Sequence, residues 1–347
     1  MAIEPEQTTE PPPEDNQEEE PKRPSLVKQA VPWVVTFLIF YWLFKRVDFA
    51  VVWEEMQGAD LWILVPPMAG LVGVQAVLEI WTFGVSYKWF ADRHPSYWQV
   101  AVARIGAYPM QALFAPLAGV QMLAYLVRVY KMRLALALAS DIFTIFPDLV
   151  QGAIGILVAV ILVHLTGGEP LHWFFYAFCV WNIIFYAFWF SYWQTGLKDR
   201  LWTRFRDVTA LQSFRLANWG QYGKMFLMRL PWFFATLASM YCCLIAFDIH
   251  VPITIFLIAA PLIMGMAFQP VSVGGYGGPQ ALAILFFKNY AAEEAILAQS
   301  LLWSTFFTLF RILAGMIFLY PMIRGFQQAD KIKVASAPVP DPAGLEE

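Results

Sequence analysis

The stretch FQPVSVGGYGGPQALAILFF, residues 268–287, interrupts an apolar region with a cluster of glycine and proline residues. Four glycines lie between Pro270 and Pro279, a composition that normally marks an exposed turn. Apolar sequence nevertheless continues on both sides of the break. Inside a membrane, a broken helix is tolerated only where protein or a water-filled cavity satisfies the free backbone N–H and C=O groups. We therefore predict that this stretch is the tip of a helical hairpin, where bare amides can hold a polar ligand.

The composition of the whole chain is typical of a membrane protein. Of its 347 residues, 59% are hydrophobic and only 14% are charged, whereas a soluble domain carries about 25% charged residues. A membrane-spanning helix needs roughly 20 predominantly apolar residues. Six segments meet or nearly meet this length: 29–46, 60–85, 134–163, 172–193, 225–247 and 294–322.

The distribution of lysine and arginine orients these spans. The 194–224 connection is rich in both residues and is assigned to the cytoplasm, whereas the 164–172 and 248–251 connections contain neither and are assigned outside. Both termini are then cytoplasmic. The interrupted stretches 96–130 and 252–290 must each return to the face that they left. We therefore predict two re-entrant hairpins that enter the cell membrane from opposite faces.

The two hairpins also resemble each other in sequence. PLAGVQMLAYLVRVY (116–130) aligns with PVSVGGYGGPQALAILFFKNY (270–290) when five extra residues are allowed in the second copy. Copies that point in opposite directions are the inverted repeats of secondary transporters. We expect an all-α polytopic membrane protein with about six transmembrane helices and two oppositely oriented re-entrant hairpins, the repeat halves being about 60–163 and 225–322.

Both ends of the chain read as polar tails. Residues 1–28 are rich in glutamate and proline and have no apolar stretch, so we expect a disordered, acidic, cytoplasmic tail. Residues 326–347 are predicted to be a disordered C-terminal tail, which leaves 29–325 as a single transmembrane domain. Neither tail has a nucleic-acid-binding signature.

The Gly-rich turn PVSVGGYG (270–277), the acidic pair Glu293–Glu294 and a long final span resemble the transmembrane region of lysylphosphatidylglycerol synthases. The same region occurs in stand-alone relatives of the flippase-like family. FKRVDFAVVWEEMQGADLWIL (44–64) is similar to that family's first loop, and AYLVRVYKM (124–132) to its first-half motif. The resemblance covers about 30–325. It implies a protein that moves lipids between leaflets.

The chain departs from this family at two places. Relatives often carry a charged pair after the second Gly-rich turn, where this chain has Pro279 and Gln280. They also carry charged residues near the first-half glycine, where this chain has Val120, Gln121 and Leu123. These departures argue against a strongly anionic head group. No aminoacyl-transferase domain follows residue 325, so we expect no synthase activity.

Two sets of residues are candidates for function. The hairpin tips are predicted to bind substrate through Pro116, Gly119, Gln121, Pro270, Gly274, Gly275, Gly277 and Gln280. Charged groups at membrane depth are costly to desolvate and are therefore functional candidates: Glu79, Arg104, Asp141, Asp148, Arg229 and Arg311. We expect Asp148 and Arg311 to pair across the repeat interface, either as a structural brace or as part of transport. Asp141 lies two turns before Asp148 on the same helical face, and we expect that face to line the cavity.

Two further groups have simpler interpretations. The outer-side residues His164, Glu169, His172, Asp248 and His250 could bind a metal or sense pH. Such residues more often sit at a wet interface, and we expect no metal and no cofactor. An amphipathic helix is predicted near 197–211, where it could bind anionic inner-leaflet lipid or only anchor the topology.

The leading hypothesis is a flippase-like transporter of a lipid or polyprenyl-linked amphiphile that works by alternating access, with membrane lipids as partners and no nucleic acid. The alternatives are a membrane-embedded lipid-modifying enzyme and a non-transporting scaffold of a lipid or envelope assembly complex. The sequence has no nucleotide loop, catalytic triad or HExxH motif, so we do not expect an enzyme. Transport would run downhill or be coupled to an ion, with Asp141 and Asp148 as candidate proton sites.

Overall fold

The structure is a computed structural model, and every element in the part of the chain that it describes is a helix. It describes residues 41, 48–113, 115–165, 167, 173–267 and 276–335. Within these residues, five helices are long and apolar enough to cross a membrane. They are α3 (Leu61–Phe90), α7 (Leu134–Leu165), α8 (Trp173–Gln194), α12 (Trp219–Ala246) and α15 (Glu293–Ala335). The prediction of an all-α membrane protein is thus confirmed.

These five helices match the second to sixth predicted spans, with different ends. The first predicted span, 29–46, lies outside the described residues except for Tyr41. Helix α12 begins at Trp219, before the predicted start at 225, because Asn218 and Gln221 form a capping box at its N-terminus. Helix α15 continues to Ala335, past the predicted boundary at 325, through a run of good helix formers.

Shorter helices connect the spans. They are α2 (Phe49–Gly58), α4 (Tyr97–Ile105), α5 (Tyr108–Leu113), α6 (Ala115–Tyr130), α13 (Ile253–Ala267) and α14 (Gly278–Phe287). The first interrupted stretch, 96–130, forms helices α4 to α6, and the second, 252–290, contains α13 and α14. Each break in the sequence therefore divides a stretch into helices too short to span a bilayer.

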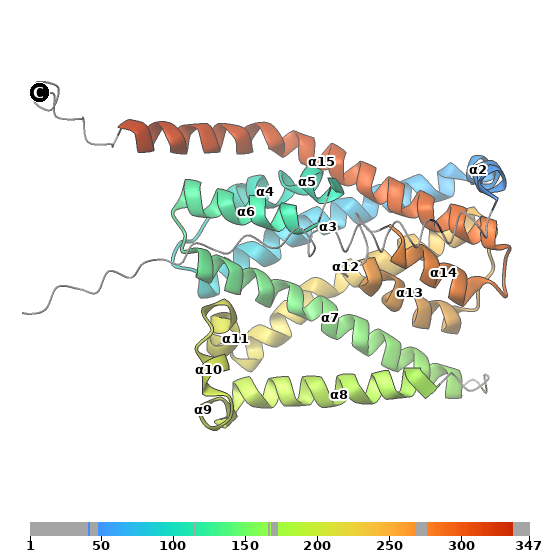
Figure 1. The fold of residues 1–347 in the computed structure, drawn as a ribbon, viewed down its shortest axis with the longest axis horizontal. Coiled ribbons are helices and arrows are strands. Elements are labelled where there is room, and N and C mark those ends of the chain that lie inside the picture. Colours follow the sequence, from blue (N-terminus) through green and yellow to red (C-terminus); the bar gives the residue numbers. More distant parts are fainter. Residues whose placement is uncertain are drawn as a thin grey trace, which may run out of the picture.

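Helix α15 organises the bundle. Figure 1 shows α4, α5 and α6 along one part of α15, and α13 and α14 near another part. Helices α3 and α12 pack against each other, while α7 contacts α3, α12 and α13. The short helices of the two sequence halves thus meet different portions of the same long helix.

The contact between α15 and the first group of short helices is close because it is made at glycines. A Cβ on Gly315 would overlap the ring of Pro109 and lie 3.0 Å from the carbonyl oxygen of Ile105. A Cβ on Gly325 would lie 2.7 Å from the ring of Tyr125. Small residues at such points allow helix backbones to approach in a membrane protein. This approach holds α5 beside the middle of α15.

The predicted amphipathic helix near 197–211 is wrong as a single element. The segment contains α9 (Leu197–Arg200), α10 (Thr203–Arg206) and the 3₁₀ helix η1 (Thr209–Leu211), followed by α11 (Gln212–Leu216). Trp202 has a φ of 49°, a left-handed conformation that ends a helix, so a continuous amphipathic helix cannot form. Hydrogen bonds from Arg206 lower the pKa of the Asp207 carboxyl. Lipid binding at this segment stays a prediction.

Candidate functional site

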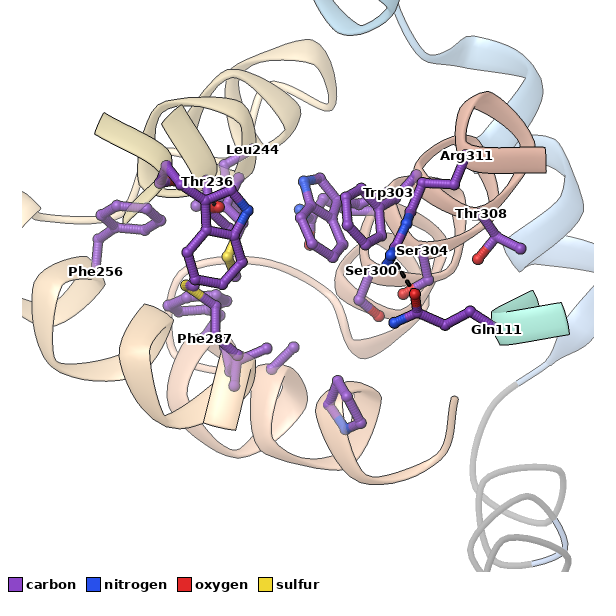
Figure 2. A pocket seen from close by; sticks show the side chains of 18 of the residues that line it. Gln111, Thr236, Leu244, Phe256, Phe287, Ser300, Trp303, Ser304, Thr308 and Arg311 are labelled. Carbon is purple, nitrogen blue, oxygen red and sulfur yellow. Dashed lines mark hydrogen bonds between the residues drawn. The ribbon is translucent and has the colours of Figure 1, made fainter. Parts of the chain in front are cut away.

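A cavity of about 110 Å³ lies among α5, α12, α13, α14 and α15. One end is apolar and includes Leu244, Phe256 and Phe287. The other end is polar, and Figure 2 shows the guanidinium of Arg311 there beside the amide of Gln111. The volume is small compared with the roughly 300–1,000 Å³ of pockets that enclose a drug-sized ligand. A drug-sized ligand would therefore not fit wholly within this cavity.

The polar end is formed largely by one face of α15. Ser300, Ser304, Thr308 and Arg311 follow at helical spacing and all line the cavity. Ser300, Ser304 and Thr308 are not among the predicted site residues, because three hydroxyl-bearing side chains are common in an apolar helix. The signal that identifies them is the successive spacing of four, four and three residues from Ser300 to Arg311, which places all four residues on one helical face.

The second interrupted stretch contributes a wall through the start of α14. The Gly277 backbone N–H donates to Oε1 of Gln280 at 2.6 Å, and Nε2 of Gln280 donates to the Ser304 hydroxyl at 3.2 Å. Gly277 has a φ of 94°, which only glycine adopts readily. Pro279 lines the cavity directly. Of the predicted substrate residues in this half, Pro270, Gly274 and Gly275 lie outside the described residues.

The first interrupted stretch contributes different residues from those predicted. Gly119 and Gln121 lie on α6 but do not line the cavity, and Gln121 instead donates to the sulfur of Met322 at 3.1 Å. Pro116 is in α6, and its side chain lies outside the described part of the structure. The lining from this half is Tyr108 and Gln111 on α5. Their substrate role cannot be read from the sequence, because it depends on how α5 docks against α15.

A buried ion pair lies beside the cavity. The side chain of Glu79 is 2% exposed and accepts a hydrogen bond from Nε of Arg104 at 2.8 Å. The Tyr108 hydroxyl donates to Glu79 at 2.8 Å, and Nε2 of Gln75 donates at 2.9 Å. The carboxylate is thus fully engaged, as a charge in a low-dielectric interior must be.

The predicted pair of Asp148 with Arg311 is wrong. Asp148 on α7 accepts two hydrogen bonds from Arg229 on α12, one of them from Nε at 2.8 Å. The side chain of Arg229 is 4% exposed and that of Asp148 is 13% exposed. Equal depth in the two halves suggested the wrong partner, since α7 packs against α12 and not against α15. The bidentate geometry makes this a strong charge-assisted contact.

Arg311 has a different environment from Arg104 and Arg229, which are each held by a carboxylate. Its guanidinium donates to Oε1 of Gln111 and lies 4.2 Å from the ring centroid of Tyr108 and 5.2 Å from that of Phe307. Aromatic faces attract a guanidinium without neutralising its charge. The positive charge of Arg311 is therefore presented at the polar end of the cavity.

Asp141 lies apart from the cavity, and so does Asp148. Asp141 is 5% exposed and accepts a hydrogen bond from the Tyr87 hydroxyl at 2.6 Å. The expectation that the Asp141–Asp148 face of α7 lines the cavity is wrong, because that face packs against α3 and α12. Asp141 forms no ion pair with any described residue, which distinguishes it from Glu79 and Asp148.

The histidine and acidic residues predicted on the outer side do not form one cluster in the described part of the chain. Nε2 of His164 lies 3.2 Å from the Tyr176 hydroxyl, and His250 lies 3.7 Å from the Asp248 carboxylate. Glu169 and His172 lie outside the described residues. Within the described ranges, no three His, Cys, Asp or Glu side chains are placed to hold a metal ion.

No protein-family model and no curated protein matches this chain. The resemblance to the lysylphosphatidylglycerol synthase region therefore stays a prediction.

Proposed function

We propose that this protein carries a lipid or polyprenyl-linked amphiphile between membrane leaflets by alternating access. The observation that supports this most directly is the cavity itself, with hydroxyls and a guanidinium at one end and aromatic and aliphatic side chains at the other. An amphiphile has the same division between a polar head and an apolar tail. Its head would occupy the polar end, and its tail would leave along the apolar side.

The arrangement of the short helices supports a transporter mechanism. Helices α4 to α6 and helix α14 contact different portions of α15, and α13 packs against α14 (Figure 1). We propose that they are re-entrant hairpins entering from opposite faces of the cell membrane, with both termini in the cytoplasm. The basic 194–224 connection then lies in the cytoplasm, as the positive-inside rule requires. Opposite hairpins around a shared site are a basis for alternating access.

The lining argues more for binding than for catalysis. Acid–base chemistry on a lipid is carried out most often by an imidazole or a carboxylate facing the substrate. The described lining of the cavity contains none of these groups. If transport is coupled to protons, Asp141 is the better candidate, because Asp148 is held by Arg229.

A fluorescent-lipid assay in proteoliposomes tests this proposal. Ser304→Phe would fill the polar end of the cavity, and we expect it to reduce the rate of leaflet exchange at least tenfold. Ile317→Phe is the matched control, because Ile317 is on the same helix and 72% exposed. Equal exchange in both variants, or exchange no faster than in protein-free liposomes for the wild type, would contradict the proposal.

A further inference from the structure

We propose that the polar end of the cavity binds the phosphate of an anionic lipid, and that Arg311 is the residue that recognises it. This inference rests on the proposed function, because it specifies the head-group charge of the transported amphiphile. The first observation is that Arg311 is 6% exposed, yet its Nε–H has no hydrogen-bond partner in the described structure. A buried charged donor without a partner is costly unless a ligand supplies the acceptor.

The second observation is the distribution of buried charges. Glu79 is held by Arg104, and Asp148 by Arg229. Among the described residues, Arg311 has no carboxylate within ion-pair distance; its guanidinium donates to the amide oxygen of Gln111 and lies against the ring of Tyr108. Its positive charge is therefore available to a ligand.

The third observation is that the neighbouring polar groups are set up as donors. Gln111 uses its oxygen to accept from Arg311, which leaves its NH₂ group for another acceptor. The Ser304 oxygen accepts from Gln280, which leaves the Ser304 O–H free to donate. Figure 2 shows Ser304, Gln111 and Arg311 at the same end of the cavity. Several donors around one guanidinium suit an anion with several acceptor oxygens, such as phosphate.

This assignment reverses an argument made from the sequence. The chain has Pro279 and Gln280 where the family that it resembles often carries a charged pair. From the sequence, the missing charge beside the Gly-rich turn argued against a strongly anionic head group. The structure places a cation at the site from the middle of α15 instead. Gln280 donates to the Ser304 hydroxyl, which lies at the same end of the cavity as Arg311 (Figure 2). The charge that recognises the head group is thus supplied by another helix.

The test measures lipid preference of the full-length protein in nanodiscs by native mass spectrometry. We expect wild-type protein to retain phosphatidylglycerol over diacylglycerol, which lacks the phosphate, by about tenfold, the order of one charge-assisted contact. Arg311→Gln should abolish the preference, and Arg311→Lys should keep part of it. Arg324→Gln is the control, because Arg324 is an exposed residue of the same helix. A folded Arg311→Gln protein that keeps the preference would overturn the inference.

A second measurement decides the case if Arg311→Gln does not fold. Glycerol 3-phosphate should raise the unfolding temperature of the wild-type protein, whereas glycerol should not. A shift without phosphatidylglycerol preference would overturn the lipid assignment and indicate a free phosphate compound. No shift and equal binding of both lipids would overturn the inference entirely. Exchange of phosphatidylcholine between leaflets would then leave the proposed function standing, while absence of any lipid exchange would contradict that function alone.

Discussion

The pairing of Asp148 with Arg229 makes a quantitative prediction that separates it from the pairing suggested by the sequence. Asp148→Leu leaves a guanidinium whose side chain is 4% exposed without its carboxylate, and Arg229→Met leaves a carboxylate that is 13% exposed. Breaking a buried ion pair costs about 3–5 kcal/mol. Each 1.36 kcal/mol is a factor of ten, so each single variant should shift the unfolding equilibrium roughly a hundredfold to a few thousandfold.

The double variant should recover most of this loss, because an apolar replacement of a whole buried pair is often tolerated. The two single losses sum to about 6–10 kcal/mol, so a double variant near wild-type stability corresponds to a favourable interaction energy of about 6 kcal/mol or more, above the roughly 0.5–3 kcal/mol usual for contacting residues because each single variant leaves a buried charge unpaired. Asp148→Leu combined with Arg311→Met is the matched comparison. Those residues form no ion pair, so their effects should add to within about 0.5 kcal/mol.

The assay is reversible unfolding in mixed micelles, followed by helical circular dichroism for all single and double variants. An additive Asp148–Arg229 cycle would show that this contact does not stabilise the fold. A larger interaction energy for Asp148 with Arg311 than with Arg229 would refute the arrangement of α7 against α12. Either result would require the buried charges to be reassigned.

Two further predictions concern packing and topology. Gly315→Ala should lower the unfolding temperature by several degrees, because the added Cβ would overlap Pro109. Gly73→Ala is the control and should not lower it, since nothing lies within 4 Å of a Cβ there. Equal effects of the two variants in thermal unfolding would contradict the close approach of α5 to α15. In a cysteine-free background, a membrane-impermeant thiol reagent added outside cells should label His250→Cys but not Arg204→Cys, and the reverse pattern would invert the proposed topology.

The class of the protein and most of its spans follow from the sequence, because they depend on local composition. Apolar length alone predicts a membrane helix, and five of the predicted spans correspond to described helices. Helix ends were less accurate. The capping box at Asn218 starts α12 early, and the left-handed Trp202 divides a segment that looked like one amphipathic helix. Both depend on local hydrogen bonds and dihedral angles that hydropathy does not record.

The sequence by itself also determined which charges lie at membrane depth, since an ionisable residue within an apolar run has to be accommodated there. Only the tertiary structure decided their partners. Asp148 meets Arg229 because α7 packs on α12, and Arg311 meets Gln111 because Gly315 lets α5 approach α15. The ion-pair partners of Glu79 and Asp148 are distant in the sequence. They are chosen by helix packing, whereas the period of a single helix shows only which of its own side chains share a face.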